Sequence, residues 1–114
     1  MSQITIYHNP RCSKSRRSLE ILYEQGLEPE IYLYLDNPLN LSQLKHLLKQ
    51  LACPARDIIR KSEAAYKALA LDNSSLSEDE LLAAIVKEPI LLERPIVVQG
   101  DVAVVGRPPE RVFE

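Results

Sequence analysis

The chain has 114 residues, of which 46% are hydrophobic and 26% are charged, and its formal net charge is -2. These values are typical of one globular domain with its own core. The nearly balanced charge argues against a general nucleic-acid or membrane-surface binder. Polar residues recur from Ser2 onward, and no apolar run approaches the roughly 18 residues of a membrane-spanning helix, so we expect no signal peptide and no membrane anchor.

The two cysteines, Cys12 and Cys53, lie far apart in the sequence. Two cysteines make no disulfide framework, and without clustered histidines they make a poor zinc site, so we expect no metal and no bound cofactor. A reducing, cytoplasmic compartment is the simplest interpretation. In such a compartment a single well-placed cysteine indicates chemistry more often than structure.

The first third of the chain predicts a βαβ unit. Apolar alternation predicts strands over residues 3–7 and 30–35. Between them we expect a turn before Pro10 and a helix that begins at Cys12 or the next residue and ends at Gly26. A strand, a helix and a strand in this space imply two parallel strands.

The middle of the chain, about residues 40–88, is predicted to be helical. The expected helices are one capped by Asn40 and Gln43, one that resumes after Pro54 and runs, with a break near Ser62, to about Leu71, and one capped by Ser77 and Glu80 that ends before Pro89.

The last part of the chain returns to strands. Residues 95–105 predict a hairpin around Gly100-Asp101, and Pro108 and Pro109 mark where a final helix could start. A βαβ unit followed by ββα, with a cysteine at the tip of the first helix, is the layout of an α/β, thioredoxin-like domain. We therefore expect one domain over residues 1–114, with the helical block as an insertion.

The setting of Cys12 favours a reactive thiol. A thiol at a helix N-terminus faces unpaired N–H groups and the positive end of the helix dipole, so its pKa should fall below the ordinary value. Arg11, Lys14, Arg16 and Arg17 strengthen this effect if they point toward the sulfur. The alternative is a small buried hydrophobic residue at the start of a helix.

No second cysteine follows, because Ser15 stands where a Cys-x-x-Cys motif would have it. The Ser15 hydroxyl could bond the thiolate, although a serine here, taken alone, is more often solvent-exposed. His8 could orient the loop or hold charge near the sulfur, and its alternative is an ordinary structural hydrogen bond.

Three arginines stand at the ends of predicted elements: Arg60, Arg94 and Arg107. A thiolate that attacks an anion needs cationic, fork-shaped donors to bring the two negative charges together. Taken singly, each arginine fits a surface salt bridge equally well.

The segments "HNPRCSKS" (8–15), "RPIVV" (94–98) and "GRPPE" (106–110) closely resemble the glutaredoxin-dependent arsenate reductase family, and Arg60 stands at the matching place in "IIRKS". The resemblance covers nearly the whole chain and implies a thioredoxin-like fold with a helical insertion. In that layout a cis-proline precedes the third strand, so we expect a cis Arg94–Pro95 bond.

The resemblance also implies the reaction. Cys12 would attack arsenate, and Arg60, Arg94 and Arg107 would bind the oxyanion. The supporting motif positions would be His8, Asn9, Ser15 and Pro95. Glutathione would attack the adduct as co-substrate, and glutaredoxin would reduce the mixed disulfide in a pathway of arsenic resistance.

Two other functions remain open. Similar folds serve as redox-sensing transcription regulators that bind RNA polymerase, although those usually carry Cys-x-x-Cys. The third possibility is a thiol-transfer enzyme that acts on glutathione mixed disulfides and uses no oxyanion.

We expect the reducing thiol to come from outside the chain, because Cys53 lies in the inserted block.

Overall fold

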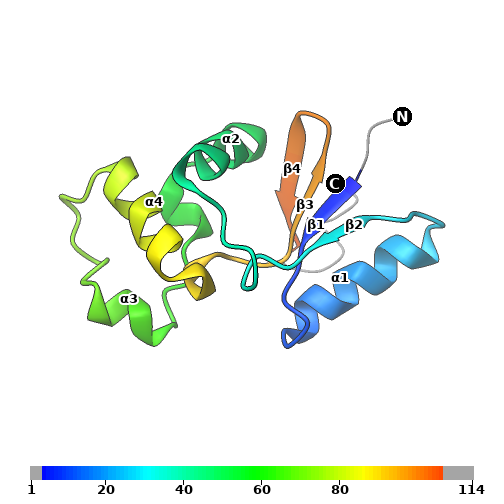
Figure 1. The fold of residues 1–114 in the computed structure, drawn as a ribbon, viewed down its shortest axis with the longest axis horizontal. Coiled ribbons are helices and arrows are strands. Elements are labelled where there is room, and N and C mark those ends of the chain that lie inside the picture. The colour runs from blue at the N-terminus through cyan, green and yellow to red at the C-terminus, as the bar shows by residue number, and fades with distance from the viewer. Residues whose placement is uncertain (1–3, 107–114) are drawn as a thin grey trace. The chain divides into compact units, whose positions relative to one another are not determined.

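The computed structural model describes residues 4–106 of the chain (Figure 1). They form two compact units, one made of residues 4–37 and 94–106 and the other of Pro38–Glu93. The first unit contains the sheet, and the second is the helical block that the sequence predicts. No helix among the described residues has the length and apolar character needed to cross a membrane.

The sheet has four strands: β1 (Ile4–Tyr7), β2 (Glu30–Tyr32), β3 (Ile96–Gln99) and β4 (Val102–Val105). Their order is β2-β1-β3-β4. Strand β1 pairs parallel with β2 and antiparallel with β3, which pairs antiparallel with β4. The thioredoxin-like α/β fold predicted from the sequence is confirmed.

Strand β2 is shorter than predicted. The sequence predicted a strand over residues 30–35, and the second half of that prediction is wrong. The Leu33 carbonyl accepts hydrogen bonds from the backbone N–H groups of Asp36 and Asn37. These bonds close a turn, so the backbone leaves the sheet after Tyr32 although the apolar alternation continues to Leu35.

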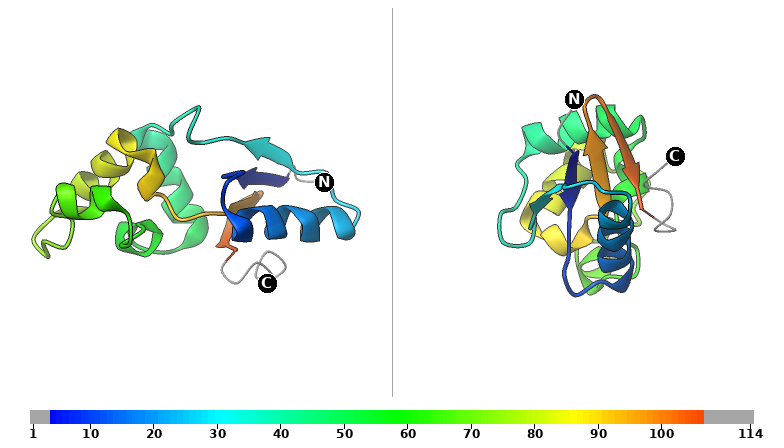
Figure 2. Two further views of the ribbon diagram at one scale, coloured as in Figure 1. Left: turned by 90° about the horizontal axis from the view of Figure 1, so that it is seen from below. Right: turned by 90° about the vertical axis from the view of Figure 1, so that its right-hand side faces the viewer.

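Helix α1 (Ser13–Glu24) connects β1 to β2 and lies alongside the sheet (Figure 2). Its Leu22 packs with Ile6 of β1 and Val97 of β3 in a buried cluster. The helix ends as predicted, because Gly26 follows its last turn with a φ of +78°, a conformation that glycine adopts without a Cβ penalty. The core contact fixes the helix, and with it the position of its first residues.

The segment that leads into β3 is also as predicted. The Arg94–Pro95 peptide bond is cis. Strands β3 and β4 form a hairpin that turns at Gly100, which has a φ of +62°. The helix expected after Pro108 lies outside the described residues.

The helical unit contains α2 (Leu41–Leu51), α3 (Ala64–Ala68) and α4 (Glu78–Lys87), with 3₁₀ helices at Ala55–Ile58 and Pro89–Leu91. Both predicted capping boxes are present. Asn40 and Gln43 exchange side-chain-to-backbone bonds at the start of α2, and Ser77 and Glu80 do the same at the start of α4.

The helix predicted between Pro54 and Leu71 is mostly absent. Ile59 forms an isolated antiparallel bridge with Leu92, and the Arg60 N–H donates to the Leu91 carbonyl at 2.7 Å. Backbone groups used in this way cannot close helical turns, so only the short α3 forms. Arg60 therefore lies in an extended segment, not at the end of a helix as the sequence suggested.

Candidate active site

Cys12 is the N-cap residue of α1, with an extended backbone. Its N–H donates to the Asn9 carbonyl at 3.0 Å, and its own carbonyl accepts from the Arg16 N–H at 3.0 Å. The loop that follows β1 therefore joins α1 at Cys12. The side chain is partly exposed, so a small reagent can reach it.

The surroundings of Cys12 favour the thiolate. Partial burial raises the pKa of its thiol, but hydrogen bonds from the backbone of Ser15, the side chain of Arg94 and the backbone of Lys14 outweigh that effect. The net pKa lies below the ordinary value, as predicted. The backbone bonds come from the unpaired N–H groups of the helix start, and Arg94 adds a positive charge.

Ser15 is the centre of a buried hydrogen-bond network. Its hydroxyl oxygen lies 2.6 Å from Nδ1 of His8 and accepts the backbone N–H of Asn9 at 3.1 Å. All three residues are buried, and Ser15 is fully so. The expectation that Ser15, taken alone, is an exposed helix serine is therefore wrong, because His8 and Asn9 of the preceding loop pack against its hydroxyl.

His8 orients this loop as a neutral side chain. Burial lowers the pKa of its imidazole, and the positive charge of Arg16 lowers it further. The ring is therefore uncharged at neutral pH, and it contributes hydrogen bonding rather than charge. Of the two functions expected for His8, the structure supports orientation of the loop.

Two further contacts hold the loop, and the sequence interpretation missed both. The Asn9 side-chain oxygen accepts the Arg11 N–H at 3.0 Å, and the Arg16 guanidinium donates to the Pro10 carbonyl at 2.8 Å. An Asn before a proline is a known signal for the first contact. No local signal indicates the second, which depends on the path of the loop beside α1.

The loop borders a hollow that is also lined by Leu33, Leu35 and Asp36. Arg11 lines it from the loop side and stands next to Cys12 in the chain. The hollow thus lies beside the loop that carries the thiol.

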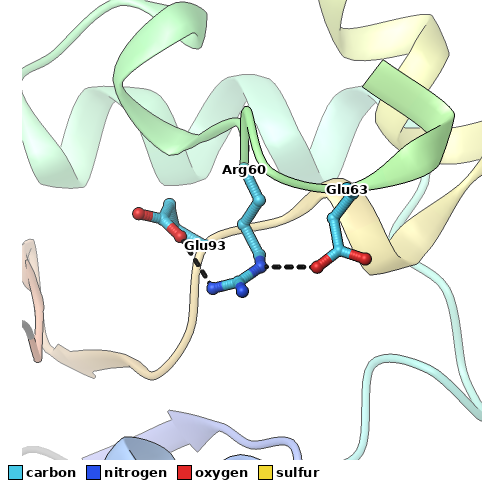
Figure 3. Close-up of polar contacts among 3 residues, drawn as sticks. All are labelled: Arg60, Glu63 and Glu93. Carbon is cyan, nitrogen blue, oxygen red and sulfur yellow. Dashed lines mark hydrogen bonds and ion pairs between the residues drawn. The ribbon is translucent and has the colours of Figure 1, made fainter. Parts of the chain in front are cut away.

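The predicted arginines differ in their surroundings. Arg94 is 8% exposed and bonds to the Cys12 thiol from the residue before Pro95. Arg60 lies in the helical unit between two carboxylates, with Nε 3.0 Å from Glu63 and Nη1 3.3 Å from Glu93 (Figure 3). Arg107 lies outside the described residues. The structure thus places Arg94 at Cys12, while the convergence of the other two arginines stays a prediction.

Cys53 has the opposite electrostatic setting to Cys12. Partial burial raises the pKa of its thiol, and the carboxylates of Asp57 and Glu78 raise it further. Cys53 is therefore less ready than Cys12 to form a thiolate.

The fold and the site together define a class of thiol-dependent proteins. Its features are a thioredoxin-like sheet, an activated thiol at the first helix, a buried arginine and a cis-proline. Within that class, the chain belongs to the ArsC family, whose model matches residues 7–114.

Comparisons with individual proteins agree with this family. The chain is 53% identical to "Uncharacterized protein YfgD" of Escherichia coli K12, covering 98% of this chain and 95% of that protein. It is 49% identical to "Arsenate reductase" of Neisseria meningitidis serogroup B, covering 98% and 97%. The solved structure of the arsenate reductase from Vibrio cholerae matches with a TM-score of 0.96 and 45% identity over 98% of this chain and 96% of that one.

Proposed function

We propose that this protein reduces arsenate to arsenite, with Cys12 as the nucleophile and a small external thiol as the second electron donor. The observation that carries the proposal is the lowered pKa of Cys12 next to the Arg94 guanidinium. An accessible thiolate with a cationic donor beside it suits attack on an oxyanion. The similarity to proteins named arsenate reductases supplies the substrate.

The chemistry balances with two thiols. The Cys12 thiolate displaces one oxygen of arsenate as water and forms a sulfur–arsenic bond. A glutathione thiolate then attacks the Cys12 sulfur, the sulfur–arsenic bond breaks, and its electron pair stays on arsenic. One arsenate, one Cys12 thiol and one glutathione thus give arsenite, water and a Cys12–glutathione disulfide. Glutaredoxin would exchange its own thiol with this disulfide and release Cys12.

In this proposal Arg94 has two functions. Its guanidinium stabilises the Cys12 thiolate before the reaction, and it binds oxygen atoms of the tetrahedral anion as the sulfur approaches. Arg60 and Arg107 are proposed as further oxyanion ligands. Asn9, His8 and Ser15 act as positioning residues, because their hydrogen bonds hold the loop that ends at Cys12.

Glutathione, not Cys53, is proposed as the second thiol, which attacks the Cys12 sulfur. The raised pKa of Cys53 makes it a poor attacking thiol at neutral pH. The partly exposed Cys12 and the adjoining hollow leave access for a small peptide thiol. A glutathione-dependent cycle would require the reducing conditions of the cytoplasm.

The test compares two substrates in one coupled assay. The assay contains purified protein, glutathione and glutaredoxin. Arsenate or a small glutathione mixed disulfide is added, and the consumption of glutathione is followed. Arsenate-dependent turnover that disappears in Cys12→Ser supports the proposal. Turnover of the mixed disulfide alone would favour a thiol-transfer enzyme, and no turnover of either would favour a non-enzymatic redox protein.

A further inference from the structure

The hollow beside the loop before Cys12 has a volume of about 360 Å³, which lies within the range of small-molecule sites. Two of the residues that line it, His8 and Asn9, are only 6% and 4% exposed. The polar atoms of buried side chains normally have hydrogen-bond partners. A polar atom of these two side chains that has no partner in the chain therefore needs one from outside it.

The hydrogen bonds of Ser15 assign the proton on His8. The Ser15 oxygen accepts the Asn9 N–H and lies 2.6 Å from Nδ1 of His8. Ser15 is fully buried, and Nδ1 is the only acceptor that residues 4–106 offer to its hydroxyl proton. The hydroxyl therefore donates to Nδ1 of the neutral imidazole, and the ring proton lies on Nε2. This Nε2–H has no hydrogen-bond acceptor in the part of the chain that the structure describes.

The Asn9 side chain has a spare donor as well. Its Oδ1 accepts the Arg11 N–H at 3.0 Å. Its Nδ2 has no acceptor among residues 4–106. Neither Nδ2 of Asn9 nor Nε2 of His8 is sealed from solvent, although both residues are buried. Two donors from buried side chains that line one hollow are thus open to an acceptor from outside the chain.

Two opposite charges line the same hollow. Arg11 and Asp36 are both exposed. Within the described residues, neither charged side chain makes a hydrogen bond or an ion pair, with the other or with a third residue. The hollow therefore offers donors with a positive charge and, separately, one negative charge. An α-amino-acid group, which carries a carboxylate and an ammonium on one carbon, matches this combination.

The hollow and the thiol share one turn of backbone. Arg11 is the residue before Cys12, so their Cα atoms lie about 3.8 Å apart. The Cys12 N–H donates to the Asn9 carbonyl at 3.0 Å. A ligand held by Arg11 and Asn9 is therefore bound to the same turn that carries the sulfur.

We propose that this hollow binds the γ-glutamyl end of glutathione, with its ammonium at Asp36 and its α-carboxylate at Arg11 and the two buried donors. The proposal rests on the proposed function, in which glutathione is the second thiol. Glutathione is the small reactant of that cycle that carries an α-amino-acid group, whereas arsenate has no ammonium for Asp36. Binding here holds the glutathione thiol close to Cys12 before it attacks the Cys12 sulfur.

The test uses S-methylglutathione, which cannot react with Cys12, so binding is separated from chemistry. It is titrated into the full-length protein while the side-chain amide signals of Asn9 are followed by NMR, and Asn9→Asp identifies those signals by their absence. The des-amino analogue, with a glutaryl group in place of the γ-glutamyl group, lacks only the ammonium. Free glutamate carries the α-amino-acid group without the rest of the tripeptide.

Asp36→Asn should weaken binding of S-methylglutathione about three- to tenfold and leave the des-amino analogue unchanged, because only the former has an ammonium. Arg11→Gln should weaken both ligands by a similar factor, because both keep the carboxylate. Glu20→Gln and Arg17→Gln are the matched controls, since they remove the same charges from exposed residues of α1 that do not line the hollow. Neither control should change either affinity.

Asn9 signals that S-methylglutathione does not move would overturn the inference. Affinities in Asp36→Asn that change equally for both ligands, or for neither, would overturn it as well. Free glutamate that binds as tightly as S-methylglutathione would also do so, because the hollow would then be a site for the free amino acid. Arsenate turnover of the wild type is measured separately. If turnover is absent while S-methylglutathione still binds as expected, the proposed function fails and the inference about the hollow stands.

Discussion

Replacing Ser15 by alanine tests whether the loop before Cys12 is held by the buried serine hydroxyl. Within residues 4–106, the substitution removes the acceptor of the Asn9 N–H and the partner of His8 Nδ1. A buried donor left without a partner costs about 1–3 kcal/mol, and the lost bond to His8 adds about 1 kcal/mol. Alanine recovers about 0.5 kcal/mol through its higher helix propensity. The free energy of unfolding should therefore fall by about 1.5–3.5 kcal/mol.

Urea denaturation followed by circular dichroism measures this loss. With a slope of about 1.5 kcal/mol per molar urea, the midpoint should decrease by about 1–2.3 M. Ser13→Ala is the control, because Ser13 is exposed in the same helix and shares the propensity gain without a buried bond. If both variants unfold at the same urea concentration, the hydroxyl does not hold the loop. Alkylation of Cys12 should also slow only in Ser15→Ala, since the N–H of residue 15 then faces the sulfur less steadily.

Three further predictions concern charge and the two thiols. Arg94→Gln removes a charged hydrogen bond worth about 1.5–3 kcal/mol, so alkylation of Cys12 by iodoacetamide at neutral pH should slow about ten- to a hundred-fold; an unchanged rate would contradict the contact. The pKa of His8 is lowered in the folded chain, so the unfolded chain binds more protons just below pH ~6.5. Stability should therefore fall as the pH drops through this range, and urea midpoints of His8→Gln should show a weaker fall. Cys53→Ser should keep glutathione-dependent arsenate turnover within a few-fold while Cys12→Ser abolishes it, and a Cys53→Ser protein that stalls with Cys12 oxidised would show an internal resolving thiol.

The elements that the sequence predicted correctly are those whose signals are local. Both capping boxes need only a side chain and the backbone three residues away, so Asn40 and Ser77 identified their helices directly. Gly26 and Gly100 marked turns in the sequence, and both adopt a positive φ in the structure. The thiol of Cys12 belongs to the same group, since a helix start supplies its N–H groups wherever the rest of the chain lies.

The elements that the sequence missed depend on contacts between distant segments. The bridge from Ile59 to Leu92 replaced a helix that the local pattern allowed. The same bridge carries Glu93 to Arg60, although 32 residues separate them in the chain. Only Glu63, three residues after Arg60, could have been suspected from spacing, because such neighbours form ion pairs where the backbone turns. Ser15 was misjudged for a similar reason, since its burial depends on how the loop folds back over α1.

The contrast between the two cysteines shows what decides reactivity in this chain. Both thiols are partly buried, and burial raises the pKa of each. Around Cys12 the next groups are N–H donors and the Arg94 guanidinium, which favour the thiolate, whereas around Cys53 they are the carboxylates of Asp57 and Glu78, which oppose it. Burial alone would thus make the two thiols alike, and the charge of the nearest groups makes them different. In the proposed reaction this difference would direct an incoming anion to Cys12, because the same positive charge that favours the thiolate would also attract the anion.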